Sequence, residues 1–239
     1  MPHSSPGYLT KQECIPVLGV DDLLIRSLLD KNQFHDPQDK ALNLGISAAT
    51  WPLFGLLWPS GARMAERMAL RPVTGERILE IGCGLALSSL VAHRRGAHVT
   101  ASDCHPLAHA FLNHNTQLNG LTPITYNHGL WGTAAKREDG QPVLTQAEDA
   151  DVNGVFDLIV GSDILYERDD EGTLASFIDA HAALTSEIWV VDPNRGNRSA
   201  FHKHMARAGF AMYEQVLDHA AHDDIAAYKG RMLTYTRNV

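Results

Sequence analysis

Short apolar runs alternate with helical patterns from residue 77 to the end of the chain. Strands are predicted at residues 77–81 and 98–102, with a weaker one at 124–128. The runs 156–161 and 188–192 are of the kind buried on both faces of a parallel sheet. Helical spacing occurs at residues 86–95, 106–118, 172–184 and 198–208. Two closing strand patterns, 211–216 and 231–236, have no convincing helix between them, so at least one should be antiparallel. The alternation predicts a doubly wound α/β fold with a mostly parallel sheet.

The remaining segments are expected to lie outside this sheet. Residues 1–18 have the composition of a polar tail, and residues 20–29 have the apolar spacing of a helix. We therefore expect a tail and a short helical extension over residues 1–54, ahead of one domain over residues 55–239. Residues 132–154, rich in charge, Gln and Gly, are expected to form a surface excursion between strands.

Composition narrows the class of protein. The 239 residues suit one α/β domain with a short appendage. Twenty basic residues against 28 acidic ones give a charge of −8, and no run of Lys and Arg offers a nucleic-acid surface. Three cysteines without a CxxC pair indicate a reducing cytoplasm. Residues 41–61 carry no formal charge, but their polar residues, prolines and glycines argue against a membrane span.

The strongest motif is a glycine turn, Glu80-Ile81-Gly82-Cys83-Gly84, where a predicted strand ends and a helix begins. In an open parallel sheet that position is the ligand crevice, and glycine lets a ligand approach the backbone. A simple strand-to-helix turn would look the same on the glycines alone. A dinucleotide site would have a third glycine where Leu87 stands, and Glu80 would repel a pyrophosphate. The chain also lacks a phosphate-binding GKS or GKT sequence. A carboxylate beside the turn suits S-adenosylmethionine, which carries an ammonium and a sulfonium and no phosphate.

An acidic residue follows the next predicted strand. Asp103 lies 19 positions after Gly84, where a carboxylate can accept both hydroxyls of a ribose. NAD shares that feature, so Asp103 alone does not separate the two cofactors. Together, Glu80, the two glycines and Asp103 favour S-adenosylmethionine.

With these motifs, residues 55–239 resemble the seven-β-strand (class I) S-adenosylmethionine-dependent methyltransferases. The resemblance implies a Rossmann-like seven-stranded sheet with an antiparallel C-terminal strand. Asp163-Ile164-Leu165-Tyr166 resembles the DxxY motif of a branch that includes protein-lysine methyltransferases and relatives labelled nicotinamide N-methyltransferase-like. Leu130-Trp131-Gly132 is similar to the loop that packs beside the adenine, and residues 54–61 resemble the segment whose tryptophan, here Trp58, borders the methionine end of the cofactor.

The resemblance implies a set of site residues. Asp163 and Tyr166 are expected on the acceptor side. The residues expected to bind the cofactor are Trp58, Glu80, Gly82, Cys83, Gly84, Asp103, Trp131 and Ser162. Other interpretations stay open: Asp163 as a helix N-cap, Tyr166 and both tryptophans as packing residues, and Cys83 as a small buried filler. The turn Asn194-Arg195-Gly196 could also border the acceptor site.

Metal chemistry is not indicated. His105 and His109 have helical i, i+4 spacing, but no HExxH motif or Cys/His cluster accompanies them. We expect no metal site.

These features predict an S-adenosylmethionine-dependent N-methyltransferase that acts on a protein lysine as a cytoplasmic monomer. Asp163 would capture and orient the acceptor, and Tyr166 would form a wall for its alkyl chain. Two alternatives remain: a methyltransferase for a small heteroaromatic or amine, and a catalytically silent protein that binds the cofactor and a partner.

Overall fold

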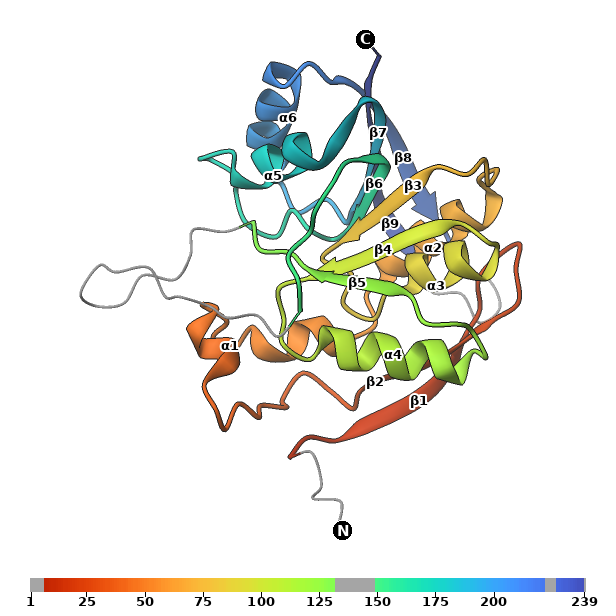
Figure 1. Cartoon of the computed structure of the whole chain (residues 1–239), viewed down its shortest axis with the longest axis vertical. Helices are drawn as coiled ribbons and strands as arrows, with labels where there is room; N and C mark the ends of the chain where they lie inside the picture. The colour runs from red at the N-terminus through yellow and green to blue at the C-terminus, as the bar shows by residue number, and fades with distance from the viewer. Residues whose placement is uncertain (1–6, 132–148, 222–226, 239) are drawn as a thin grey trace, which may run out of the picture.

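A computed structural model describes residues 7–131, 149–221 and 227–238 of the chain. Its centre is a seven-stranded sheet in the order β5-β4-β3-β6-β7-β9-β8 (Figure 1). The strands are β3 (Arg77–Ile81), β4 (His98–Asp103), β5 (Thr125–His128), β6 (Phe156–Ser162), β7 (Ala182–Asp192), β8 (Ala211–His219) and β9 (Tyr228–Arg237). Strands β3 to β7 are parallel to one another, and the C-terminal strand β9 runs antiparallel between β7 and β8. The predicted α/β class, with a mostly parallel sheet and an antiparallel C-terminal strand, is confirmed.

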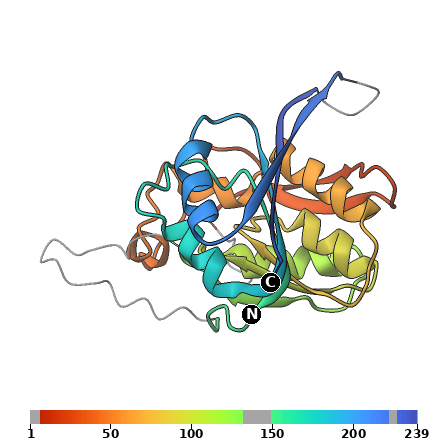
Figure 2. The ribbon, with the colours of Figure 1, turned by 90° about the horizontal axis from the view of Figure 1, so that it is seen from above.

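Helices cover both faces of the sheet, as the view along its edge shows (Figure 2). One face carries α2 (Pro59–Leu70), α3 (Leu87–Arg94) and α4 (Ala108–Leu118), and the other carries α5 (Thr173–His181) and α6 (Arg198–Arg207). Successive strand residues alternate between these layers, so Ile78 packs in the first core and Leu79 in the second. Both side chains are buried, which is why the strand patterns read as continuous apolar runs.

The N-terminal extension differs from the prediction. Strands β1 (Thr10–Ile15) and β2 (Leu23–Leu28) form an antiparallel hairpin, so the helix predicted over residues 20–29 is wrong, and part of the predicted tail is a strand. Leu23 and Ile25 are buried while Leu24 between them is 47% exposed, which is the alternation of a strand. Helical segments occur only later in this region, as α1 (Lys40–Asn43) and the 3₁₀ turn η1 (Trp51–Gly55).

Asn115 of α4 and Asn119, the residue that caps its C-terminus, explain why this segment is extended. The Asn115 side chain accepts the N–H of Arg26 at 2.8 Å and donates to its carbonyl at 3.3 Å. Asn119 makes the same pair of bonds with Leu24, at 3.1 and 2.8 Å. The two side-chain amides thus satisfy the outer edge of β2 as a neighbouring strand would.

Residues before and after position 54 share one hydrophobic core. Ile25 and Trp51 pack in the same cluster as Met64 and Ile78. The division of the chain at residue 54 stays a prediction. Most of the expected excursion, residues 132–148, lies outside the described residues. Among the helices that the structure describes, none is long and apolar enough to cross a bilayer.

Candidate active site

The glycine turn between β3 and α3 lies at the carboxyl ends of the parallel strands. Gly82 and Gly84 have φ values of +58° and +50°, which favour glycine. A Cβ at Gly82 would lie 3.0 Å from Ile164 and 3.1 Å from Trp131. A Cβ at Gly84 would lie 2.8 Å from the carbonyl oxygen of Phe54. Both positions therefore require glycine for space as well as for conformation.

Asp103, the last residue of β4, is joined to this turn. Its Oδ2 accepts the N–H of Gly84 at 2.8 Å, and its Oδ1 accepts the N–H of His105 at 2.9 Å. The residue is 7% exposed, and desolvation raises the pKa of its carboxyl despite these bonds. The expected ribose-binding carboxylate thus lies against the second glycine of the turn.

Glu80 lies inside the protein beneath the turn. It is 3% exposed, and its Oε2 accepts both the N–H of Ser89, at 2.8 Å, and the Ser89 hydroxyl, at 2.5 Å. Desolvation is the main cause that raises its pKa to about 7. Glu80 therefore anchors α3 to the sheet, and its role toward the cofactor stays a prediction. Cys83 is also buried, and its N–H binds the Ser102 carbonyl at 2.9 Å, which ties the turn to β4.

The two predicted tryptophans have defined contacts. Trp131 packs over Gly82 and against Phe177, with ring centroids 5.9 Å apart. Trp58 precedes α2, and its indole N–H donates to the Leu53 carbonyl at 2.9 Å. Both indoles therefore have fixed orientations.

The start of α2 also reaches the end of β6. A Cβ at Gly61 would lie 3.6 Å from the hydroxyl oxygen of Ser162. The predicted cofactor residue Ser162 thus lies beside the helix that follows Trp58.

Asp163 follows β6 and is already paired. Its side chain is 8% exposed, and both carboxylate oxygens accept N–H groups of Arg195, one from Nη2 at 2.9 Å and the other from Nε. Its backbone has a φ of +59°, and its N–H donates to the Val191 carbonyl at 2.8 Å. Ile164, the next residue, packs on Gly82, so Asp163 lies close to the glycine turn. The described structure gives it no helix to cap, since α5 begins at Thr173.

Tyr166 lies on the same loop with its side chain 54% exposed. Its backbone carbonyl accepts a bond from the Asn197 side chain at 3.1 Å. Desolvation of the hydroxyl raises its pKa most, followed by the charges of Cys104 and Asp103 after β4. The ring is therefore accessible from solvent.

Three buried polar atoms near the ends of β4 and β5 have no hydrogen-bond partner within the described structure: Ser102 Oγ, His105 Nε2 and His128 Nε2. Unpartnered buried atoms are costly unless a ligand or water satisfies them. His105 stacks on Phe54, with ring centroids 3.7 Å apart, and desolvation lowers its pKa to about 3, so the ring is neutral. The Asp103 carboxylate and the bare glycine backbone are the groups of this region that suit a nucleoside-containing cofactor.

Sequence analysis did not select Phe54, His105 or Ile164 for this site. The signal for Phe54 was its place at the start of the segment that contains Trp58. His105 had been weighed only as a metal ligand. Within the described residues, no group of three His, Cys, Asp or Glu side chains could hold a metal ion.

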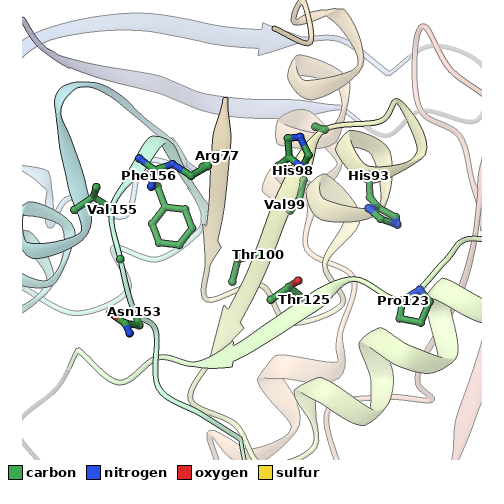
Figure 3. Close-up of a pocket in the computed structure, with 12 residues that line it drawn as sticks. Arg77, His93, His98, Val99, Thr100, Pro123, Thr125, Asn153, Val155 and Phe156 are labelled. Carbon is green, nitrogen blue, oxygen red and sulfur yellow. The ribbon is translucent and has the colours of Figure 1, made fainter. Parts of the chain in front are cut away.

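A cleft of about 330 Å³ lies at the other end of the sheet (Figure 3). It is lined by the first residues of four strands, including Arg77, His98, Thr125 and Phe156. Parallel strands place their amino ends opposite the glycine turn, so this cleft is separate from the candidate active site.

Comparisons with known proteins agree with this geometry. No protein-family model matches the chain. The electron transfer flavoprotein beta subunit lysine methyltransferase of Rattus norvegicus is 27% identical over 148 residues, which cover 60% of this chain and 51% of that protein. The histone-arginine methyltransferase METTL23 of Mus musculus is 27% identical over 181 residues, which cover 73% of this chain and 66% of that protein. The chain thus spans about half of the first of these relatives.

Among solved structures, the magnesium protoporphyrin IX methyltransferase of Synechocystis PCC 6803 with bound SAM has a TM-score of 0.56 at 16% identity. The match covers 86% of this chain and 100% of that one. We conclude that the chain has the seven-stranded fold of the class I methyltransferases and is similar in sequence to protein lysine and arginine methyltransferases.

Proposed function

We propose that the chain is an S-adenosylmethionine-dependent N-methyltransferase that acts on a lysine of a protein. The observation that carries this proposal is that the Gly82–Gly84 turn, the Asp103 carboxylate and the Asp163 carboxylate lie at one edge of the sheet. The Asp103 carboxylate is bound to the turn, and Asp163 immediately precedes Ile164, which packs on it. The similarity to protein methyltransferases supports the acceptor class.

The cofactor half of the site would use residues after β3, β4 and β5. Asp103 would hold the ribose hydroxyls, Trp131 would pack on the adenine, and Trp58 would border the methionine end. The backbone of Gly82 and Gly84 would allow close approach. The bound cofactor supplies a methyl group on a sulfonium, which is already activated toward displacement. The protein must therefore mainly align the acceptor nitrogen and exclude water.

The acceptor half must solve a protonation problem. A lysine has a reference pKa of about 10.4, so its neutral amine costs roughly 4.6 kcal/mol at pH 7. Its lone pair forms the new N–C bond as the sulfur–carbon bond breaks and that electron pair stays on sulfur. Asp163 would orient the amine, and Tyr166 would pack along its alkyl chain. The pairing of Asp163 with a guanidinium also fits an arginine acceptor, as in the name of one relative.

A cytoplasmic location and a monomeric state are part of the proposal. The three cysteines, Cys14, Cys83 and Cys104, are all free, which supports a reducing compartment. Size-exclusion chromatography with light scattering measures the oligomeric state.

Transfer of a labelled methyl group tests the function. Purified protein is incubated with methyl-labelled S-adenosylmethionine and a cell extract, and the protein and small-molecule fractions are counted separately. Label on a protein, mapped by mass spectrometry to a lysine, supports the proposal. Label on an arginine changes the residue class, and label only in small molecules favours the heteroaromatic or amine alternative. Cofactor binding without transfer in any fraction favours a silent binding protein.

A further inference from the structure

The carboxylate assigned to the acceptor does not stand alone. Asp163 and Arg195 form a two-point ion pair across the loops after β6 and β7. The Arg195 guanidinium also lies 5.9 Å from the ring centroid of Trp58, within the range of a cation–π contact. Hydrogen bonding to Asp163 raises the pKa of Arg195 above its already high value, so the guanidinium keeps its positive charge beside the carboxylate.

The loop that carries Arg195 is held in place by several bonds. Asn194 has a φ of +64°, and its N–H donates to Asp192 Oδ2 at 3.0 Å. Its side-chain oxygen accepts from Arg198 at 2.9 Å and from Arg231 at 3.0 Å. These bonds fix the backbone of the turn that carries Arg195. Only the Arg195 side chain must therefore become ordered for the pair with Asp163 to form.

This pairing bears on the protonation problem of a lysine acceptor. A lone carboxylate beside an ammonium stabilises the charged form and so opposes loss of its proton. A fixed guanidinium nearby has the opposite effect, since like charges disfavour the ammonium. Each carboxylate oxygen has lone-pair capacity beyond its bond to Arg195, so Asp163 can still accept an N–H from the acceptor.

We propose that Arg195 is a positioning residue for the acceptor amine: it balances the charge of Asp163, which then orients the amine without retaining its proton. The proton of the ammonium leaves to solvent water before methyl transfer, and the neutral amine keeps its N–H bond to Asp163. The inference rests on the proposed lysine methylation and assigns a role to a residue of that same site.

Other titratable groups face this pair and contribute to the electrostatic potential around it. Asp192, the last residue of β7, is fully buried, and its carboxylate is paired with Arg198 at 3.2 Å. The Tyr228 hydroxyl, bonded to Ser60 at 3.0 Å, has a pKa raised by desolvation, and the charges of Asp163 and Asp192 add to that rise. Arg63 of α2 acts on Tyr228 in the opposite direction. None of these groups is changed by the substitutions below.

The test is the pH profile of methyl transfer by Arg195→Gln and Arg195→Lys. The acceptor is the cell-extract protein that the wild type labels, and initial rates are measured from pH 6 to 10 over a range of acceptor concentrations. Arg195→Gln should lower kcat at pH 7 about 10- to 100-fold, recover to within a few-fold of wild type near pH 9.5, and leave KM unchanged or lower. Arg195→Lys keeps the charge and should keep most of the wild-type profile.

Two controls separate this effect from general ones. Arg77→Gln removes the same charge from the opposite end of the sheet, where the side chain is 54% exposed, and should not move the profile. Calorimetric affinity for S-adenosylhomocysteine should stay within a few-fold in all variants, which shows that the cofactor site is folded.

Three results overturn the inference. Arg195→Gln with an unshifted pH profile shows that Arg195 does not act on the acceptor's proton. Faster transfer at pH 7 by Arg195→Gln shows that the guanidinium blocks the acceptor position. Equal losses at all pH values, also in Arg195→Lys, indicate a purely structural role. If the wild type labels no lysine, the proposed function itself has failed, which is distinct from each of these results.

Discussion

The side chain of Asp103 binds the backbone N–H of Gly84 at 2.8 Å, so the carboxylate that ends β4 is tied to the turn that follows β3. The same carboxylate binds His105 N–H at 2.9 Å. These bonds orient it before any ligand arrives and leave lone-pair capacity on both oxygens. A preoriented acceptor loses less entropy when it binds ribose hydroxyls.

Asp103→Ala should therefore weaken S-adenosylmethionine binding at least tenfold in calorimetry. Hydrogen bonds to a charged group contribute roughly 1.5–3 kcal/mol each, and one such loss exceeds a factor of ten. The melting temperature should also fall, because the N–H groups of Gly84 and His105 lose their acceptor. Asp103→Asn, which keeps the shape, should lose less stability. An unchanged affinity in a folded variant would place the ribose elsewhere.

Trp131→Ala should weaken binding of S-adenosylmethionine and S-adenosylhomocysteine by similar factors, because both ligands carry adenosine. The ring packs over Gly82 and against Phe177, so its removal uncovers the turn. Phe177→Leu is the matched control, since it removes the outer ring and leaves the indole in place. A large drop in melting temperature with no change in either affinity would assign Trp131 to packing.

Gly84→Ala should destabilise the protein more than Gly120→Ala. Both glycines have positive φ, +50° and +65°, so each alanine incurs the backbone cost of about 1–2 kcal/mol. At Gly84 the new Cβ would also meet the Phe54 carbonyl at 2.8 Å, whereas at Gly120 nothing lies within 4 Å. Thermal unfolding measures the difference. Equal losses in the two variants would contradict the close packing of η1 on the turn.

Glu80 should make the protein less stable as the pH rises. Its carboxyl has a pKa of about 7 in the folded state against an ordinary value of 4.5, so between these pH values the folded state binds a proton that the unfolded state has lost. The contribution of Glu80 therefore declines from about pH 4.5 to 7, by roughly 3 kcal/mol in all.

Glu80→Gln should remove this part of the pH dependence, because the amide does not titrate and can still accept the Ser89 N–H. Denaturant unfolding of both proteins at pH 5 and pH 8 gives the comparison. If the free energy of unfolding changes by the same amount between pH 5 and pH 8 in both proteins, the raised pKa of Glu80 is contradicted.

Strands β3 to β6 could be predicted to within one residue at each end, whereas β7, β8 and β9 each extend at least three residues beyond the predicted ranges. The predicted run over residues 77–81 is β3, because the strand is buried on both faces from Ile78 onward and its positions are apolar except the exposed Arg77 and the bonded Glu80. The end of the predicted helix over residues 172–184 was wrong, since Ala182 already begins β7. Ala182 pairs with Phe156, a contact distant in sequence that no local pattern records.

The N-terminal hairpin could not be predicted from local spacing. Leu23, Leu24, Ile25, Leu28 and Leu29 fit a helical face as well as a strand. Asn115 and Asn119 favour the strand over the helix, because their side chains bind the backbone edge of β2 from about 90 residues away in the sequence. Tertiary hydrogen bonds thus override the helical pattern.

The candidate site was predictable where motifs follow strands directly. Gly82, Gly84 and Asp103 come together because neighbouring parallel strands end at the same edge of the sheet. The partner of Asp163 was not predictable, because Arg195 is 32 residues away in the sequence. The two residues come together because β6 and β7 are neighbours in the sheet. The charge state of a site depends on such pairs, and one carboxylate in a motif does not reveal it.

Asp163→Asn tests the acceptor side of the crevice. The amide keeps the size of the side chain and the backbone bond to Val191, so S-adenosylmethionine affinity should stay within a few-fold of wild type. Turnover on the protein acceptor should fall roughly 10²-fold, the scale lost when a positioning group is removed. Tyr166→Phe should lower turnover less, because the exposed ring persists and only the hydroxyl is lost.

The kinetics of these two single variants are then compared with those of Arg195→Gln and of the double variant Asp163→Asn/Arg195→Gln. Because Asp163 and Arg195 act as a pair, the double variant should lose much less than the product of the two single losses. Full activity of Asp163→Asn on a lysine would remove the residue-level support for that acceptor and favour a neutral one, which needs no counter-charge.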